Sequence, residues 1–401
     1  MTLTKKVRNL IINTAMVMVS LYLTLVVGSI FGPSIIGKLL YSPEVKLIQL
    51  DKELLDVEKR AAEADGYTSI FRPASFNGSY SLRQVAEKNS SPVIGALPYQ
   101  KAYVCNEGYG LILERLDRMG FRNSDDLWDK VNEIEVMLVG DSMVFGECVH
   151  RKDSISERLI DSGLMTVSLG IGANSPAEYI LTQKIFLSAI KPNYLVMVFY
   201  PNDKSRSNGS FFFKYASKLG FAENYLAREG NSLQLSNKTK AVYKDIETLV
   251  RKRIQNESSL SFYESLGNRI LSLRNPDIWR LTRFKRFITK RLNVYEAKID
   301  SGTREAVKLA TETCEKVKCI PIFVYIPNDQ VFDPLKHADS YVRNLKEYSR
   351  SLGVSLIDTS QEIRSNNRAA VYSPYGLHLS PFGYELVSNA ILTEIASYEE
   401  N

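Results

Sequence analysis

The chain has 401 residues, of which 44% are hydrophobic and 24% are charged, and its formal net charge is +6. This composition excludes an intrinsically disordered chain and allows one large domain or two ordinary ones. The mildly positive charge does not distinguish nucleic acid, an anionic membrane and an acidic glycan as partners. The four cysteines and three histidines do not have the spacing of a zinc site, so we expect no metal and no organic cofactor.

A long apolar run marks the N-terminus. Three basic residues precede an uncharged stretch over residues 10–31, which is long enough for a helix to cross the hydrocarbon core of a bilayer. A cleavable signal peptide is the alternative, but its apolar region is shorter and ends in small residues, whereas this run ends Gly-Ser-Ile-Phe. The basic flank favours a cytoplasmic stub over residues 1–9 and an exported body, periplasmic if the source is bacterial. We therefore expect a single-pass membrane protein with a signal-anchor.

Two segments with weaker signals follow the apolar run. Residues 32–66 are expected to form a juxtamembrane stalk, because from residue 40 onward they are rich in Leu, Lys and Glu. Residues 67–133 combine turn residues with no clear hydrophobic period, and we expect them to be an extension that packs on the core.

From residue 134 the pattern changes to short β-rich runs that alternate with helix-like stretches. Continuous apolar strands separated by helices indicate a doubly wound parallel sheet with helices on both faces. Five strands are predicted, over Ile134–Val139, Met165–Leu169, Tyr194–Tyr200, Ile320–Tyr325 and Val354–Ile357. The sequence therefore predicts an α/β fold.

Residues 204–300 interrupt this alternation and are predicted to form a basic helical insertion. They contain 20 Lys and Arg against 9 Asp and Glu, so the rest of the chain is net acidic. Within them, residues 278–292 alternate aromatic or aliphatic residues with basic ones. This stretch is an amphipathic helix with its apolar side on the core, a helix on an anionic membrane surface, or the lining of a groove for an acidic substrate.

The cysteines leave two interpretations open. Cys314 and Cys319 are close enough to join the end of a helix to the start of the next strand, and Cys105 and Cys148 could form a second pair. Two disulfides would fit an oxidising compartment. The alternative is four buried free thiols.

A serine follows the first predicted strand, in Gly140-Asp141-Ser142. Ligands of open α/β sheets bind at the carboxyl ends of the strands, so this serine is placed for chemistry. The tripeptide alone is a weak signal, because Asp-Ser is also an ordinary helix cap. Three further segments strengthen it, namely the turn Gly170-Ile171-Gly172-Ala173-Asn174, then Tyr200-Pro201-Asn202-Asp203, and finally Gly376-Leu377-His378-Leu379-Ser380-Pro381.

In this order the four segments resemble the SGNH (GDSL-like) hydrolases, a family with a flavodoxin-like doubly wound sheet. The resemblance covers roughly residues 134–396 and implies a hydrolase-like domain over residues 134–401. The segment Asp117–Asn123 is similar to a preamble found in exported, membrane-anchored members of that family.

The resemblance implies a role for each matching residue. Ser142 attacks an ester carbonyl and His378 removes its proton. The oxyanion is held by the backbone N–H groups of Ser142 and Ala173 and by the side chain of Asn202, and one such donor contributes ~2.7–4 kcal/mol to transition-state stabilisation.

The chain departs from the family pattern at the residue that orients the histidine. The family usually has Asp three residues before the histidine, where this chain has Tyr375. A neutral phenol, with a pKa of ~10, cannot replace a carboxylate electrostatically. The alternatives for this role are a backbone carbonyl, which some members of the family use, Tyr375 itself, and Asp358, which would reach the site from the fifth strand.

Several functions fit these features. The leading one is a serine esterase that removes acyl groups, with acetyl as the expected group, from an exported or cell-envelope glycan. An acyltransferase with the same Ser-His site differs only in the acceptor. A catalytically weakened module in glycan assembly or export would explain Tyr375, and membrane glycan-assembly proteins are then candidate partners. A phospholipase is a further alternative, whereas no recognition motif supports nucleic-acid binding.

Overall fold

The computed structural model of the chain describes residues 20, 55–76, 80–203, 223–257, 299–332 and 340–400. By its internal contacts the chain divides into two units, one of residues 55–250 and 297–401 and the other of residues 1–54 and 251–296. The first unit contains all the elements discussed below, except the end of helix α9. The predicted anchor, apart from Ser20, and the basic stretch over residues 278–292 lie outside the described residues. In the described ranges, no helix combines the length and the hydropathy needed to cross a membrane.

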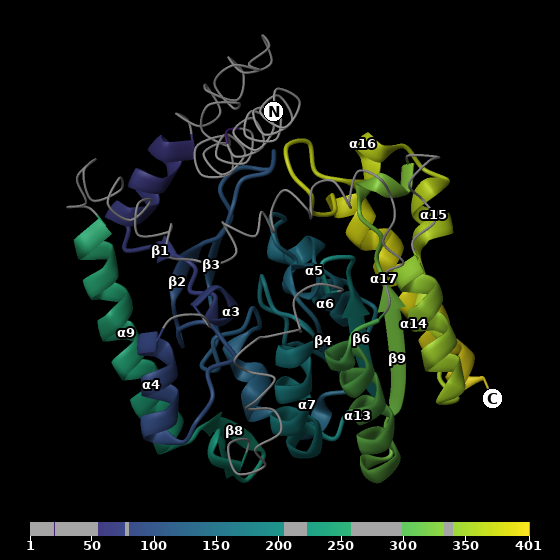
Figure 1. The fold of residues 1–401 in the computed structure, drawn as a ribbon, viewed down its shortest axis with the longest axis horizontal. Helices are drawn as coiled ribbons and strands as arrows, with labels where there is room; N and C mark the ends of the chain where they lie inside the picture. The colour runs from purple at the N-terminus through teal and green to yellow at the C-terminus, as the bar shows by residue number, and fades with distance from the viewer. Residues whose placement is uncertain are drawn as a thin grey trace, which may run out of the picture. The chain divides into compact units, whose positions relative to one another are not determined.

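A five-stranded parallel sheet forms the centre of the first unit (Figure 1). Its strand order is β10-β9-β6-β4-β5, and every neighbouring pair is parallel. Counted along the chain this is the 2-1-3-4-5 order of a doubly wound, flavodoxin-like sheet, so the predicted α/β fold is confirmed. The strands are β4 (Val136–Val139), β5 (Thr166–Ser168), β6 (Tyr194–Phe199), β9 (Ile320–Tyr325) and β10 (Leu356–Asp358).

The strands are apolar throughout because both faces of the sheet are covered. Side chains alternate between the faces along a strand, so Met137 and Val139 belong to one core cluster and Val136 and Leu138 to the other. The first face is covered by α7 (Pro176–Ile190), α13 (Ser301–Val317) and α14 (Ser340–Ser351). The second face is covered by α5 (Ser142–Phe145), α6 (Ile155–Asp161), α15 (Ser360–Arg364), α16 (Arg368–Val371) and α17 (Pro381–Glu399). Short 3-10 turns η3 (Arg151–Asp153) and η7 (Asp329–Phe332) complete this part.

The segment before the sheet, residues 67–133, forms a small layer of its own that shares the first core cluster. Its three strands pair in the order β1-β2-β3, and Phe121 and Trp128 place their rings 5.9 and 5.7 Å from that of Phe186 on α7. The elements are β1 (Thr68–Ser69), α3 (Pro73–Phe76), α4 (Tyr80–Asn89), β2 (Lys101–Tyr103), β3 (Leu113–Arg115), η1 (Asp125–Asp129) and η2 (Val131–Glu133). Residues 55–64, at the end of the predicted stalk, are helical.

Asp117, in the preamble segment, is the centre of a buried hydrogen-bond cluster. Its Oδ1 accepts the backbone N–H groups of Met119 and Phe121, both at 2.8 Å. Its Oδ2 accepts from Asn123 Nδ2 at 2.9 Å and from Trp128 Nε1 at 2.8 Å. Burial raises the pKa of Asp117 to about 6, although these four donors act in the opposite direction. The cluster gives the preamble a structural role, since it fixes the loop that precedes the sheet.

Two other preamble residues join this layer to the sheet. Asn123 bonds both backbone groups of Ser168 at the end of β5, with distances of 2.8 and 2.9 Å. Arg122, which is buried, pairs with Glu114 at 2.5 Å and donates to the carbonyls of Gly146 and Val149 at 2.5 and 2.9 Å. The loop that follows α5 is therefore held by a residue from outside the sheet.

The described part of the predicted insertion starts as a β-hairpin and continues as a helix. Strands β7 (Leu226–Glu229) and β8 (Ser232–Leu235) are antiparallel and precede α9 (Asn237–Glu257). α9 lies beside α4 (Figure 1), and the ion pair of Lys88 and Asp245 joins them at 3.4 Å. After α4, the N–H of Gly95 donates to Tyr243 Oη at 3.1 Å. The prediction of a helical insertion missed this hairpin, whose turn is made by Gly230 at φ 61°.

Candidate active site

Ser142, the predicted nucleophile, is the first residue of α5 and comes three residues after the end of β4. Asp141 caps this turn by accepting the N–H of Met143 at 3.0 Å, and it also accepts from Asn202 Nδ2 at 2.9 Å. Asn202 follows β6, the neighbour of β4, so this hydrogen bond joins the two strand ends at the point where the strand order reverses. That point is where doubly wound sheets bind their ligands.

The turn that carries Asn202 is shaped by the residue after it. Asp203 is completely buried, and it accepts the N–H of Tyr200 at 2.9 Å and the hydroxyl of Tyr179 at 3.1 Å. The Tyr-Pro-Asn-Asp segment therefore folds back on itself at the end of β6, with its aspartate inside and Asn202 beside the nucleophile turn.

The third predicted oxyanion residue, Ala173, lies between β5 and α7 with φ 72°. A residue with a Cβ costs roughly 1–2 kcal/mol in this left-handed region, and such strain persists where the surrounding structure imposes it, often at functional sites. The neighbouring Gly172 has no room for a side chain, because a Cβ there would lie 2.5 Å from Glu147 Oε2 and 2.7 Å from Arg72 Nε. The turn is thus packed directly against the loop that follows Ser142.

Three contacts bring the segment with His378 to the nucleophile turn. Tyr200 Oη donates to the carbonyl of Leu377 at 3.4 Å, which ties the segment to the end of β6. Tyr384, on α17, places its hydroxyl 4.0 Å from Met143 Sδ and 3.5 Å from the carbonyl of Glu147. Ser380 caps α17 through the N–H of Gly383, which fixes where the helix begins. These contacts set the segment of His378 beside the nucleophile turn, but no hydrogen bond joins the side chains of Ser142 and His378, both of which lie in the described ranges.

A carboxylate absent from the predicted site occupies the orienting position. Glu107 Oε1 lies 2.9 Å from His378 Nδ1, and its Oε2 accepts the backbone N–H of His378 at 3.2 Å and the hydroxyl of Ser373 at 2.5 Å. Glu107 comes from the loop between β2 and β3, in the layer before the sheet. Gly376 makes this approach possible, since a Cβ there would lie 1.7 Å from the carboxyl carbon of Glu107.

Neither residue predicted for that position bonds the imidazole. Asp358 accepts the N–H of Ser360 at 3.0 Å at the start of α15, and the side chain of Tyr375 points to solvent, with the residue 65% exposed. Tyr375 contributes through its backbone, whose N–H donates to the carbonyl of Glu107 at 3.2 Å. Only one signal in the sequence pointed to Glu107, namely its place two residues after Cys105, which pairs with Cys148 six residues after Ser142.

The two groups shift each other's protonation. Burial lowers the pKa of His378, but the hydrogen bond to Glu107 and the charges of Glu147, Glu107 and Asp141 outweigh it and raise that pKa above its usual 6.5. Burial likewise raises the pKa of Glu107, yet the hydrogen bond and charge of His378 and the bond from Ser373 leave it below its usual range. Glu107 is therefore an anion that accepts from Nδ1–H, which leaves Nε2 as the basic nitrogen of the neutral ring.

A second carboxylate lies on the other side of the imidazole. Glu147 Oε2 is 3.9 Å from His378 Nε2, and the same carboxylate forms an ion pair with Arg72. Arg72 follows β1, so it too belongs to the layer before the sheet. Its positive charge opposes a transfer of the imidazole proton toward Glu147.

Replacing Glu147 by Gln is expected to lower the pKa of His378, because it removes a negative charge that stabilises the imidazolium. A proton NMR titration of the three histidines would measure this, with His378 assigned from a His378→Gln variant. Glu133→Gln, at the opposite end of β4, is the matched control and should leave the titration unchanged. A pKa of His378 that stays the same in Glu147→Gln would show that the charge of Glu147 is fully neutralised by Arg72.

Both candidate cysteine pairs are disulfides, Cys105–Cys148 and Cys314–Cys319. This result decides between the two interpretations of the sequence. Donor atoms of Glu107, Cys148 and His378 lie within 4.8 Å of one another, which is a geometry that metal ions use. A disulfide sulfur is not a thiolate, however, so the oxidised trio offers only a carboxylate and an imidazole as ligands.

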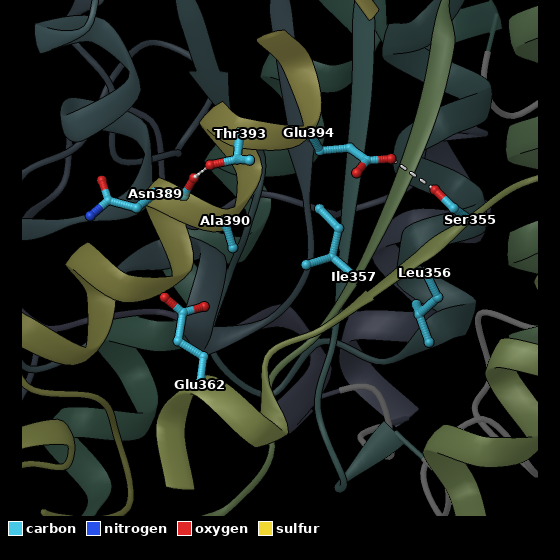
Figure 2. Close-up of a pocket in the computed structure, with 8 residues that line it drawn as sticks. All are labelled: Ser355, Leu356, Ile357, Glu362, Asn389, Ala390, Thr393 and Glu394. Carbon is cyan, nitrogen blue, oxygen red and sulfur yellow. Dashed lines mark hydrogen bonds between the residues drawn. The ribbon is translucent and has the colours of Figure 1, made fainter. Parts of the chain in front are cut away.

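A hollow separate from this site lies between β10, α15 and α17 (Figure 2). Ser355 Oγ donates to Glu394 Oε1 across it at 2.8 Å. It is lined by Ser355, Leu356, Ile357, Glu362, Asn389, Ala390, Thr393 and Glu394. Neither Ser142 nor His378 lines this hollow, so it is distinct from the candidate active site.

No protein-family model matches the chain, and no curated protein matches it by sequence. Several solved structures are similar to part of it, including the following two. The lipase/acylhydrolase from Enterococcus faecalis is 13% identical at a TM-score of 0.34, over 66% of this chain and 96% of that one. A catalytic mutant of an acetylxylan esterase from Geobacillus stearothermophilus is 14% identical at a TM-score of 0.35, over 65% and 93%. Similarity at this level carries no weight for function, which rests on the geometry of the site.

Proposed function

We propose that the protein is a serine ester hydrolase that removes acyl groups, with acetyl as the expected group, from an exported or cell-envelope glycan. The observation that carries the proposal is the anionic carboxylate of Glu107 on Nδ1 of His378, whose segment contacts the α5 turn of Ser142 through Tyr384. A histidine held in this tautomer is a general base on its Nε2 side, which is what a serine needs to become a nucleophile at neutral pH.

The reaction then runs in two halves. Ser142 Oγ attacks the acyl carbonyl as its proton passes to His378 Nε2, and the oxyanion is held by the N–H groups of Ser142 and Ala173 and by the amide of Asn202. The bond between the acyl carbon and the sugar oxygen breaks, and that oxygen takes the proton from His378. Water then attacks the acyl-enzyme with His378 as base, which releases a carboxylic acid and restores Ser142.

We also propose that this domain works outside the reducing cytoplasm. Two disulfides support that location, because such bonds are rare in cytosolic proteins. The apolar run over residues 10–31 would then tether the domain to the membrane beside a glycan that is being exported or attached. This tether also accounts for the basic flank that precedes the run.

A fluorophosphonate probe tests the proposal without requiring the natural substrate. The full-length protein is expected to form one covalent adduct, which peptide mass spectrometry should map to Ser142. Ser142→Ala should abolish labelling, and pretreatment with p-nitrophenyl acetate should slow it. A protein that is folded but unlabelled, and that releases no p-nitrophenol beyond the Ser142→Ala background, would instead support a glycan-binding module without catalysis.

The same acyl-enzyme would serve an acyltransferase if a sugar hydroxyl replaced water in the second half. Adding a short oligosaccharide to the p-nitrophenyl acetate assay distinguishes the two reactions. A hydrolase yields acetate at an unchanged rate, whereas a transferase diverts the acetyl group to the sugar, where mass spectrometry detects it.

A further inference from the structure

The carboxylate on the imidazole comes from a hairpin loop and not from the sheet. Glu107 lies between β2 and β3, where backbone pairing continues only as far as the bonds between Val104 and Ile112 and between Cys105 and Ile112. The loop belongs to the layer before the sheet, whereas the nucleophile and the histidine belong to the sheet and its helices. The position of the carboxylate therefore depends on what fastens the tip of this loop.

A disulfide fastens the loop to the loop that follows the nucleophile. Cys105, two residues before Glu107, is bonded to Cys148, and their Cα atoms are 5.3 Å apart. Cys148 is 1% exposed and its Sγ lies 3.5 Å from His378 Nδ1, so the bond packs directly against the imidazole. One covalent bond thus joins the loop of the carboxylate to the loop that follows the nucleophile, and it packs against the imidazole between them.

We propose that Glu107 is the residue that positions the His378 imidazole, and that the Cys105–Cys148 disulfide holds it there, so that efficient catalysis requires the oxidised protein. This inference rests on the proposed serine hydrolase function. It also explains how the site works with Tyr375 in the place where a carboxylate was expected.

The geometry favours this role over a purely structural one. Glu107 accepts hydrogen bonds from three groups of the turn that carries the histidine, namely Ser373 Oγ, the His378 backbone and Nδ1. The first two set the carboxylate in place, and the third selects the tautomer in which Nε2 is basic. An anion there also stabilises the imidazolium that forms when Ser142 loses its proton.

Reduction of the Cys105–Cys148 disulfide should free the loop that carries Glu107. A dithiol such as dithiothreitol donates two electrons and two protons, the Cys105–Cys148 bond becomes two thiols, and the reagent is oxidised to its cyclic disulfide. The loop is then fastened by single hydrogen bonds, such as that from Asn106 Nδ2 to Glu58 Oε2 at 3.0 Å. A displacement of about 1 Å in such a group costs about 10²-fold in rate.

The first arm of the test changes the carboxylate. Glu107→Gln in the full-length protein is expected to lower kcat and kcat/KM for p-nitrophenyl acetate together, by about 10²–10⁴-fold. The acid limb of its pH profile should move to lower pH, because the imidazolium loses its anionic partner and the pKa of His378 falls. Glu107→Asp should restore part of the rate and of the profile. A structural role alone would lower the amount of folded protein without moving the acid limb.

The second arm removes the disulfide. Cys105→Ala/Cys148→Ala is expected to lose about 10- to 100-fold in kcat/KM, and dithiothreitol should lower the wild-type rate in the same direction. The loss should nearly vanish in the Glu107→Gln background, because the bond acts through that carboxylate. Cys314→Ala/Cys319→Ala removes the other disulfide, at the amino end of β9, and is the matched control that should keep full activity. EDTA in all assays excludes metal capture by the freed thiolate of Cys148.

Gly376→Ala gives an independent check if the double cysteine variant folds poorly. Its methyl group would overlap the carboxylate of Glu107, so it should reproduce the Glu107→Gln profile with both disulfides intact. The inference is overturned if Glu107→Gln keeps its rate and its acid limb while Ser142→Ala is inactive. The disulfide part alone is overturned if loss of the bond costs as much in the Glu107→Gln background as in the wild type. A wild-type protein with no Ser142-dependent reaction would refute the proposed function instead.

Discussion

Ser142→Ala is expected to lower kcat/KM for p-nitrophenyl acetate by about 10³-fold or more, and His378→Ala by a similar factor. In the proposed mechanism the two residues act as one unit, since the serine is a weak nucleophile without a base and the base has no proton to remove without the serine. The double variant should therefore be little slower than either single one. Stopped-flow assays of the full-length protein, with the concentration of folded protein taken from absorbance and circular dichroism, would measure all three rates.

Ser365→Ala and His150→Ala are the matched controls, because each removes the same functional group from an exposed position. Both should stay within about twofold of the wild type. Losses in Ser142→Ala and His378→Ala that multiply in the double variant would contradict the mechanism, since independent effects imply that the two side chains do not share one proton transfer.

Asp117→Asn is expected to lower the free energy of unfolding by about 3–5 kcal/mol, although it changes one atom and leaves the shape intact. Each carboxylate oxygen of Asp117 accepts from two donors. An asparagine has one oxygen, so its amide nitrogen must face two donors whichever way it is turned. Two buried donors are then left without an acceptor, and the amide hydrogens point at them.

Urea titration followed by tryptophan fluorescence would measure this loss, because Trp128 is one of the four donors and is fully buried. Asp126→Asn makes the same change on the exposed side of η1, where an ion pair contributes at most about 1 kcal/mol. If Asp117→Asn cost no more than this control, the four donors would have other acceptors within reach, and the structural role assigned to the preamble would be wrong.

The sheet could be predicted from the sequence because burial on both faces leaves a strong signature. Strands such as Tyr194–Phe199 and Ile320–Tyr325 are apolar at every position, and a parallel strand between helical layers needs no polar face. Their boundaries were right to within about two residues, as turn residues stop each run. The β7–β8 hairpin was missed since its exposed residues dilute the alternation that would reveal it.

The residues of the candidate site could likewise be predicted where they follow an apolar strand and not where they lie in an irregular loop. Ser142, Asn202 and the turn of Ala173 could be located because each follows a predictable strand, and the carboxyl ends of parallel strands meet at one edge. Glu107 could not, because it stands in an irregular loop of a layer whose short strands have no period. Its contact with His378 spans 271 residues of chain, and nothing local to either residue encodes it.

That separation has a consequence for the order of events during synthesis. A nascent chain can form α5 and its serine turn as soon as that part of the chain has been made, whereas His378, the proposed base, is synthesised 236 residues later. The loop that carries Glu107 is synthesised earlier, so its carboxylate has no imidazole to bind until the segment of His378 has been made. Under the proposed mechanism, a nascent chain that lacks His378 would not react with esters, and activity would begin only after the segment of His378 had reached the loop of Glu107.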